Sequence, residues 1–549
     1  MFVREKNIRG YTYLYLVESV REEGRMKQRI IRNLGRKEAV LASGDLDRLA
    51  SSVGRYAERA MVLQAIEQSS TSLHTRRIGA PLLFGRLWED TGCRAVIEGL
   101  LTERKFEFAV ERAVFAAVLH RIMASGSDRA CEKWLVDYDI PGADDLALHH
   151  FYRAMAWLGE ELPEARQANA TPFSPRTVKD EIEEALFARR KDLFTDLSVV
   201  FMDTTSLSFE GAGGATLGAH GHSKDHRPDL NQMIVGVVID GEGRPVCSEM
   251  WPGNTADVSV LIPVIDRLRH RFGIGRVCVV ADRGMISAAT MAALEERGLE
   301  YVLGVRERTD VLVRRVVLED DKRFTPLLIE RATGETQLFV KEVTVERRRY
   351  IVARNEAEAD KDRADRAAIV EGLDRQLKKG DKALVGNSAY RRYLRSTSPG
   401  AFEIDAGKIA DEARYDGIFV LRTNARITPL QAVLRYRDLL QVEELFRTAK
   451  ALMRTRPIYH SSDEAIRGHV FCSFIALVLR KELHKRCEAA AIKPEWADVL
   501  RELDRLQTGV IEKDGKVITV RTPATGSIGN VFRAAGVALP PNVAEAQAA

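Results

Sequence analysis

Residues 197–305 contain the pattern that most restricts the fold of this chain. Short apolar runs rich in Val, Ile and Phe alternate there with segments whose apolar residues recur at helical spacing. The expected order is β-β-β-α-β-α-β, over Leu197–Phe209, Asn231–Asp240, Pro245–Met250, Asp257–Phe272, Arg276–Ala281, Ser287–Arg297 and Leu299–Val305. A turn at residues 240–243 makes the first three strands an antiparallel meander. The pattern predicts an α/β fold.

Three acidic residues are placed where a shared site is expected. Asp203 lies inside the first apolar strand, Asp282 directly follows the strand that ends at Ala281, and Glu443 lies in an amphipathic helix. A carboxylate among apolar neighbours is costly unless another group compensates its charge. The three carboxylates can converge at one edge of a sheet, where they suit Mg²⁺ or Mn²⁺. Two such ions about 4 Å apart can bind the attacking and leaving oxygens of a phosphodiester.

The helix around Glu443 also carries a basic surface. Tyr436 and Lys450 each lie seven residues from Glu443, close to two helical turns, so the three are expected on one face. Basic residues outnumber acidic ones between residues 435 and 456, namely Arg435, Arg437, Arg447, Lys450, Arg454 and Arg456 against Asp438, Glu443 and Glu444. Such side chains commonly contact DNA phosphates.

These motifs resemble those of DDE transposases, in particular insertion-sequence family four and its branch named sixteen-thirty-four. The motifs are D-T-T at 203–205, A-D-R-G at 281–284 and Tyr436-x6-Glu443-x6-Lys450, with further similar stretches at 221–229, 252–255 and 456–460. The resemblance covers residues 80–485. It implies an RNase H-like catalytic core with a β-rich insertion before the acidic helix, plus an N-terminal helical DNA-binding region.

The resemblance also implies roles for single residues. Asp203, Asp282 and Glu443 would be catalytic and would hold two Mg²⁺ ions, for which Mn²⁺ can substitute. DNA would be contacted from the loop after the first strand, from beside Asp282 and from the acidic helix, through His222, Lys224, Arg227, Arg283, Tyr436, Arg447 and Lys450. Leu439 stands where the family pattern has Arg four residues before the Glu, so Arg447 is expected to supply that phosphate contact.

Changes of pattern divide the rest of the chain. At 549 residues it is too long for a single core. We expect a small β unit and helical connector at 1–75, a helical DNA-binding region at 76–193, the first part of the core at 194–305, the β-rich insertion at 306–425, the acidic helix and following helix of the core at 426–490, and a C-terminal region at 491–549.

The composition narrows the class of protein and the cellular compartment that we expect. The 6 cysteines include no C-x2-C pair, which argues against a zinc ribbon or a disulfide scaffold. The longest apolar run, Val470–Leu479, is about half of the ~20 residues that a membrane span needs. No secretory signal follows Met1. We therefore expect a bacterial cytoplasmic protein without a membrane partner, nucleoid-associated when bound to DNA. Because the net charge is only +4, a DNA-binding surface must be local.

The expected function is that of a transposase of an insertion sequence. It would bind terminal inverted repeats and target DNA, and would cleave and transfer strands by a metal-dependent, cut-and-paste reaction. Pairing two ends implies a homodimer in the DNA complex. Two alternatives stay open: a catalytically inactive, domesticated DNA-binding protein, and a stand-alone nuclease of the RNase H fold. The role of His220, His222, Asp225 and His226 also stays open between zinc binding, phosphate contact and plain loop.

Overall fold

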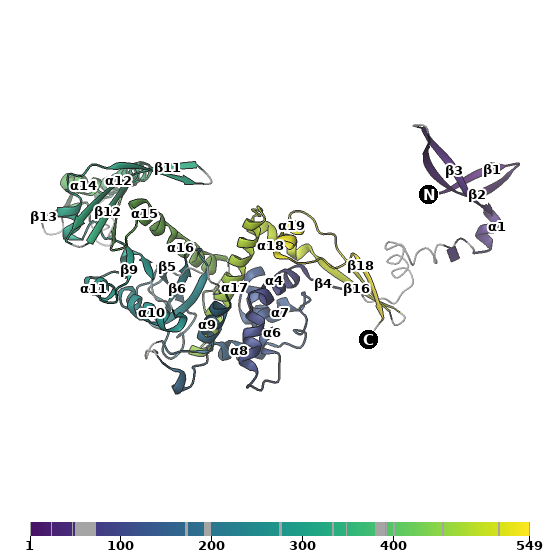
Figure 1. Ribbon diagram of the computed structural model, residues 1–549, viewed down its shortest axis with the longest axis horizontal. Coiled ribbons are helices and arrows are strands. Elements are labelled where there is room, and N and C mark those ends of the chain that lie inside the picture. The colour runs from purple at the N-terminus through teal and green to yellow at the C-terminus, as the bar shows by residue number, and fades with distance from the viewer. Residues whose placement is uncertain are drawn as a thin grey trace. The chain divides into compact units, whose positions relative to one another are not determined.

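The computed structural model describes residues 2–547, except residues 23–24, 45, 47, 50–72, 169, 171–173, 191–198, 274–276, 332–333, 347, 379–389, 391, 399–400, 453–454 and 514–515 (Figure 1). It forms two compact units. The first comprises Met1–Gly79, Glu495–Phe532 and Ala538–Ala549, and the second comprises Ala80–Pro494 and Arg533–Val537.

The first unit contains two small antiparallel sheets. One has the order β1-β2-β3, from β1 (Phe2–Ile8), β2 (Tyr11–Glu22) and β3 (Arg25–Arg36), and is followed by α1 (Lys37–Ala42). The other has the order β18-β17-β16-β4, from β18 (Val543–Gln547), β17 (Lys516–Arg521), β16 (Gln507–Lys513) and β4 (Leu73–Arg77). α18 (Trp496–Arg505) precedes β16, and α19 (Ile528–Ala535) lies between β17 and β18.

The N-terminal part of the chain is therefore made of strands, which corrects the expected helical N-terminal region. Helices become dominant only from Gly79. Most of the predicted helical connector lies outside the described residues, and its last part is the strand β4, which pairs with β16. The pattern could not show this pairing, because β16 lies more than 400 residues further along the chain.

A group of helices forms part of the second unit, namely α4 (Gly79–Asp90), α5 (Cys93–Leu101), α6 (Val110–Met123), α7 (Asp128–Leu135), α8 (Leu148–Leu158), η1 (Glu164–Arg166) and α9 (Val178–Arg190). The long helix α17 (Asp463–Ala489) packs against α6 and α8. Two glycines permit this contact. A Cβ on Gly468 would lie 2.0 Å from the Met155 carbonyl oxygen, and one on Gly159 would lie 2.0 Å from the Glu464 carbonyl oxygen. None of the helices in the described ranges combines the length and hydropathy needed to cross a bilayer.

A 9-stranded mixed sheet is the centre of the second unit, with the order β10-β11-β12-β15-β9-β8-β5-β6-β7. Its catalytic half contains β5 (Val199–Ser208), β6 (Gln232–Asp240), β7 (Pro245–Pro252), α10 (Asp257–Phe272), β8 (Cys278–Ala281), η2 (Arg283–Met285), α11 (Ala288–Glu296) and β9 (Glu300–Gly304). The predicted β-β-β-α-β-α-β order is confirmed. β5, β6 and β7 pair antiparallel, whereas β8 is parallel to both β5 and β9.

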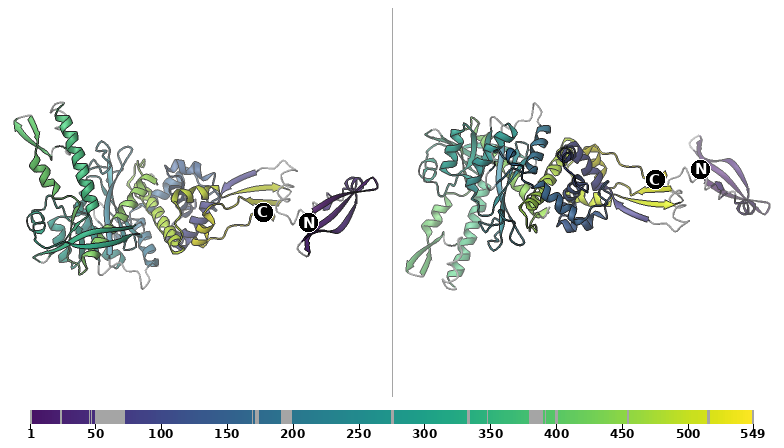
Figure 2. Two further views of the ribbon diagram at one scale, coloured as in Figure 1. Left: turned by 90° about the horizontal axis from the view of Figure 1, so that it is seen from above. Right: turned by 90° about the horizontal axis from the view of Figure 1, so that it is seen from below.

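The other half of the sheet comes from residues after β9. It contains η3 (Val313–Val317), β10 (Thr325–Arg331), β11 (Gly334–Val345), β12 (Arg348–Arg354) and β15 (Ile418–Thr423). Between β12 and β15 the chain forms α12 (Glu356–Leu377), β13 (Leu394–Ser398), β14 (Ala401–Ile404) and α14 (Ala406–Ala413). α12 and the β13–β14 hairpin project together from this half (Figure 2). β15 pairs antiparallel with β9, with Leu421 opposite Gly304, so this region extends the sheet of the core.

The close helix contact predicts a strong effect at Gly468. Gly468→Ala should lower the free energy of unfolding of the second unit by about 2–4 kcal/mol, because neither backbone can move aside for the new methyl group. Denaturant titration followed by circular dichroism measures this. Gly99→Ala in α5 is the matched control, since a Cβ there meets nothing within 4 Å, and it should be neutral or stabilising by up to ~1 kcal/mol. Equal stability of the two variants would contradict the packing.

Candidate active site

Parallel pairing of β5 with β8 brings two of the predicted acidic residues together. In the strand register Met202 lies opposite Ala281, and Asp203 and Asp282 are the next residues on each strand. Asp203 is still inside β5, whereas Asp282 directly follows the last residue of β8 and precedes η2. The two carboxylates thus lie at neighbouring positions of one sheet edge, as the sequence predicted.

Asp203 has an environment unfavourable to its charge. Burial raises the pKa of this carboxyl to about 6, and the charges of Asp282 and Glu443 act in the same direction. Two groups oppose the rise, namely the ammonium of Lys224 and the backbone N–H of Thr204, which donates to Asp203 Oδ1 at 2.7 Å. Glu443 is therefore near enough to Asp203 for its charge to act on that carboxyl.

The predicted long helix around Glu443 is divided. α15 (Pro429–Asp438) ends at Leu439, α16 (Leu440–Arg447) follows, and the π-helical turn η5 (Thr448–Leu452) continues the chain. Glu443 lies in the first turn of α16 and is exposed, and α16 packs against β5. Because a π-turn changes the angular spacing of residues, a seven-residue separation no longer guarantees one face. The structure accordingly directs Lys450 to another partner, Asp225, at 2.8 Å.

Tyr436 links α15 to the acidic site. Its hydroxyl donates a hydrogen bond to Asp282 Oδ1 at 3.0 Å. Burial and then the charge of Asp282 raise the pKa of Tyr436 far above its usual value, so the phenol stays protonated and can keep donating. The approach depends on Gly304 at the end of β9, where an added Cβ would lie 2.3 Å from the Tyr436 hydroxyl oxygen.

Lys224 lies beside Asp203 and is engaged inside the protein. Its ammonium donates to the carbonyl oxygen of Thr204 at 2.8 Å and to Thr204 Oγ1 at 2.7 Å, and it pairs with Asp257 at 3.0 Å. Asp257 also accepts a hydrogen bond from Thr204 Oγ1 at 2.7 Å. This arrangement places one positive charge next to the buried carboxylate of Asp203.

The other predicted DNA contacts are exposed. Arg283 is half exposed and lies 3.5 Å from Glu307, and Arg227 pairs with Asp229 at 2.8 Å within the same loop. His222 and Arg447 are exposed as well. These placements leave the side chains accessible, and their contact with DNA stays a prediction.

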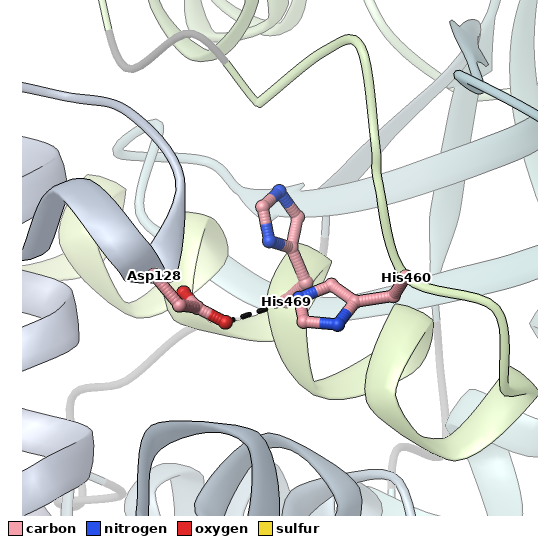
Figure 3. A group of neighbouring side chains, drawn as sticks. All are labelled: Asp128, His460 and His469. Carbon is pink, nitrogen blue, oxygen red and sulfur yellow. Dashed lines mark ion pairs between the residues drawn. The ribbon is translucent and has the colours of Figure 1, made fainter. Parts of the chain in front are cut away.

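A different group of side chains has the composition of a transition-metal site. Asp128, His460 and His469 offer ligand atoms that all lie within 4.8 Å of one another, and in the described residues no other such trio is found (Figure 3). His460 Nε2 lies 3.1 Å from Asp128 Oδ2. Arg121 already supplies a positive charge there, because its Nη2 lies 2.8 Å from His469 Nδ1 and 3.8 Å from Asp128 Oδ1.

We interpret this trio as a buried polar network. Burial and the charge of Arg121 lower the pKa of His469 to about 3, so the ring is neutral, and its Nε2 lies 3.2 Å from the Thr455 carbonyl oxygen. Both ring nitrogens are therefore engaged. In the described residues, His220, His222, Asp225 and His226 form no comparable group, and Asp225 pairs instead with Lys450 and Arg456.

Sequence reasoning missed three residues that shape the site: Asp257, Gly304 and the role of Asp225 as a partner of Lys450. Asp257 starts α10 after the P-G-N-T stretch at 252–255, which was noted only as a family motif. Gly304 ends a strand and carries no signal of its own. Only the fold shows that Tyr436 passes over it.

Comparisons with known proteins decide the family. The model of the transposase DDE domain matches residues 194–479, and that of the IS1634 family transposase N-terminal domain matches residues 3–68. The chain belongs to the DDE transposases. The N-terminal match identifies the IS1634 branch. Family membership implies DNA cleavage and strand transfer as the activity of this transposase.

Other comparisons add little. No curated protein matches the transposase. Among solved structures it is similar to a cryo-EM structure of the piggyBac transposase synaptic complex with hairpin DNA, with a TM-score of 0.38 and 12% sequence identity over 80% of this chain and 82% of that chain.

The contact between Tyr436 and Gly304 predicts a positional effect. Gly304→Ala should displace the tyrosine hydroxyl and break its bond to Asp282, and Tyr436→Phe should remove the same bond without steric change. Each should lower the cleavage rate by about 10-fold or more, because a lost bond to a charged group is worth about 1.5–3 kcal/mol. Single-turnover cleavage of an end duplex measures this. Additive losses in the double variant would contradict action through one bond.

The raised pKa of Asp203 predicts that this residue destabilises the metal-free transposase. Its folded pKa of about 6 exceeds the ordinary aspartate pKa of 3.8, so the folded state disfavours the ionised form above pH 6. In EDTA at pH 8, Asp203→Asn should increase the free energy of unfolding by about 1–3 kcal/mol. The gain should shrink as the pH falls from 6 towards 3.8, where wild-type Asp203 becomes protonated in the folded state.

Urea titrations at several pH values test this prediction. The matched control is Asp266→Asn, which removes a partly exposed carboxylate that pairs with Arg297 at 2.8 Å. That variant should lose up to ~1 kcal/mol at pH 8. A destabilising effect of Asp203→Asn at pH 8 would show that the carboxylate is compensated in the folded protein.

Proposed function

We propose that Asp203, Asp282 and Glu443 hold two Mg²⁺ ions, with Mn²⁺ as a substitute, at the end of an RNase H-like core. The observation that carries the proposal is the adjacent placement of Asp203 and Asp282 on paired parallel strands, within the electrostatic reach of Glu443. The order β7-β6-β5-β8-β9, with β5 to β7 antiparallel and β5, β8 and β9 parallel, supports the RNase H-like assignment.

The chemistry of the side chains fits such ions. All three donors are carboxylates, which are the oxygen ligands that Mg²⁺ prefers. Among the charges near Asp203, that of Lys224 lowers the pKa of this carboxyl, whereas those of Asp282 and Glu443 raise it. The three do not lie within 4.8 Å of one another in the way that Asp128, His460 and His469 do. A wider spacing suits a pair of ions about 4 Å apart better than one ion.

The protein's own groups would orient this site. The Tyr436 hydroxyl donates to one oxygen of Asp282, and the Thr204 N–H donates to one oxygen of Asp203, so these bonds would hold each carboxylate in position for an ion. When bound, the ions would activate the attacking hydroxyl and stabilise the leaving oxygen of a phosphodiester. Exposed Arg283 and Arg447 flank Asp282 and Glu443 in sequence and would hold the DNA backbone by its phosphates.

The wider assembly follows from the substrate. The DNA would be terminal inverted repeats and a target, and pairing two ends would require a homodimer. The helices between Gly79 and Arg190 would contribute to end binding. Such an enzyme would act in the bacterial cytoplasm, at the nucleoid. Cleavage without strand transfer would instead favour the stand-alone nuclease.

Glu443 and Glu444 provide the sharpest test, because they are adjacent and both exposed. The charge of Glu443 acts on Asp203 and Tyr436, whereas the charge of Glu444 acts on Arg480 of α17. Glu443→Gln should abolish Mg²⁺-dependent cleavage of an end duplex, with a loss of at least ~1000-fold, since a neutral amide is a poor ligand for a hard cation. Glu444→Gln is the matched control and should keep activity within about 3-fold. The reverse result would mean that Glu444 is the ligand.

A further inference from the structure

Two basic side chains meet on a single carboxylate next to the candidate active site. Lys450 Nζ lies 2.8 Å from Asp225 Oδ1, and Arg456 Nη1 lies 2.5 Å from Asp225 Oδ2. The three residues come from separate segments: Asp225 from the loop between β5 and β6, Lys450 from η5, and Arg456 from the segment before α17. Lys450 and Asp225 are largely buried, with side-chain exposures of 12% and 10%, and Arg456 is 33% exposed.

This carboxylate has the form of a phosphodiester group. Both are monoanions with two equivalent oxygens on one central atom, and both accept charge-assisted hydrogen bonds at about 2.7–2.9 Å. Lys450 and Arg456 each contact a different oxygen of Asp225. The same two cations could contact the two non-bridging oxygens of one backbone phosphate with little rearrangement.

Three cations are gathered around Asp225. Burial lowers the pKa of Lys450, the charges of Arg456 and Lys224 lower it further, and Asp225 opposes them. Lys224 is paired with Asp257 and also lies beside Asp203. Without Asp225, Lys450 and Arg456 would have no carboxylate partner in the described residues, and a DNA phosphate is an anion that they would attract.

The contact made by Asp225 is exchangeable. Asp225 Oδ2 is close to Arg456 but has no aligned hydrogen-bond donor, so charge alone holds it. In the described part of the chain, Lys450 and Arg456 are the side chains that pair with this carboxylate. Asp225 lies in a turn whose next residue, His226, has a φ of 57°. Loss of the carboxylate from this position would break no regular secondary structure.

We propose that Lys450 and Arg456 form a binding position for one DNA backbone phosphate, and that the carboxylate of Asp225 occupies this position until DNA displaces it. The proposal rests on the proposed function, because it takes DNA as the ligand. It adds Arg456 as a phosphate contact and Asp225 as a competitor.

This competition would make DNA binding selective. Any duplex must displace Asp225, and part of the gain from the phosphate contact is offset by the ion pairs that are lost. An inverted repeat makes further contacts that outweigh this loss, whereas random DNA has only its backbone. Disfavouring the wrong partner in this way is a general route to specificity.

Salt-dependent DNA binding tests the proposal. Fluorescence anisotropy would be measured in EDTA, without cleavage, on an end duplex and on a random duplex of equal length, between about 50 and 200 mM salt. Asp225→Asn should bind the random duplex about 3- to 10-fold more tightly at the lowest salt. Its log Kd against log salt should be steeper by about 1, since each phosphate neutralised by an unpaired cation adds ~0.9 to the slope. The preference for the end duplex should fall by a similar factor.

Two variants control for charge and for position. Asp266→Asn removes a negative charge whose partner, Arg297, is not among the predicted DNA contacts, so the slope should change by less than half as much. Asp225→Glu keeps the charge and should restore the wild-type slope. An Asp225→Asn slope equal to that of wild type or of Asp266→Asn would overturn the proposal.

Should Asp225→Asn fail to fold, as judged by thermal unfolding, Lys450→Gln and Arg456→Gln test the site from the other side. Each should weaken binding of the end duplex more than Arg297→Gln does, since Arg297 pairs with Asp266 and is not among the predicted DNA contacts, and equal affinities would overturn the proposal. Mg²⁺-dependent cleavage by the wild-type protein distinguishes a failure of this proposal from a failure of the proposed function. A wild-type protein that cleaves, together with an unchanged Asp225→Asn slope, refutes only the competitor role, whereas a wild-type protein that neither binds nor cleaves DNA refutes the proposed function.

Discussion

The hydrogen-bonded pairing of β5 with β8 is the constraint on which the candidate site depends. The register sets Met202 against Ala281 and so fixes which residues follow at the sheet edge. A shift by one residue would turn either Asp203 or Asp282 to the opposite face. Apolar residues keep this register, because Val200, Phe201, Val279 and Val280 are all buried. The buried apolar residues of β5 and β8 thus determine the positions of the Asp203 and Asp282 carboxylates.

The charges of these acidic residues lower the stability of the metal-free protein. Asp203 is a buried carboxylate near two others, and Lys224 compensates it only in part. The second carboxylate, Asp282, accepts a hydrogen bond from Tyr436. The Tyr436 side chain can lie there because Gly304, at the end of β9, has no Cβ. Two neighbouring cations are also held by ion pairs: Lys224 pairs with Asp257, and Lys450 pairs with Asp225. These hydrogen bonds and ion pairs therefore hold the charged side chains of the site in place without a ligand.

Much of the core could be predicted from the sequence. Strands buried on both faces are continuous apolar runs, as in β6 and β8, and such runs are visible without a structure. Asp203 and Asp282 were found because an acidic residue in or directly after such a run is unusual. Glu443 was found from its place in an amphipathic helix, with Tyr436 and Lys450 at a spacing of seven, and the family motifs then gave the three residues their expected roles.

The remaining features could not be read from local patterns. β1 is exposed along its whole length and has no apolar period, so its bounds could not be read within the predicted small β unit. The division of the helix at Leu439 has no Gly or Pro signal, and the π-turn that redirects Lys450 has none either. Asp225, Asp257 and Gly304 act through partners that lie between 33 and more than 200 residues away, which only the fold reveals.

The route of the chain through the large sheet has a consequence for how this protein can vary. The chain leaves the catalytic half at Gly304, and it returns in β15 on the strand hydrogen-bonded to β9. The exit and entry points are therefore direct neighbours, whatever lies between them. Segments such as α12 and the β13–β14 hairpin could lengthen, shorten or be exchanged among related elements while Glu443 stays in place. The sequence and length of α12 and the β13–β14 hairpin can therefore vary. β15 must be retained, because it pairs with β9 and leads the chain back towards Glu443.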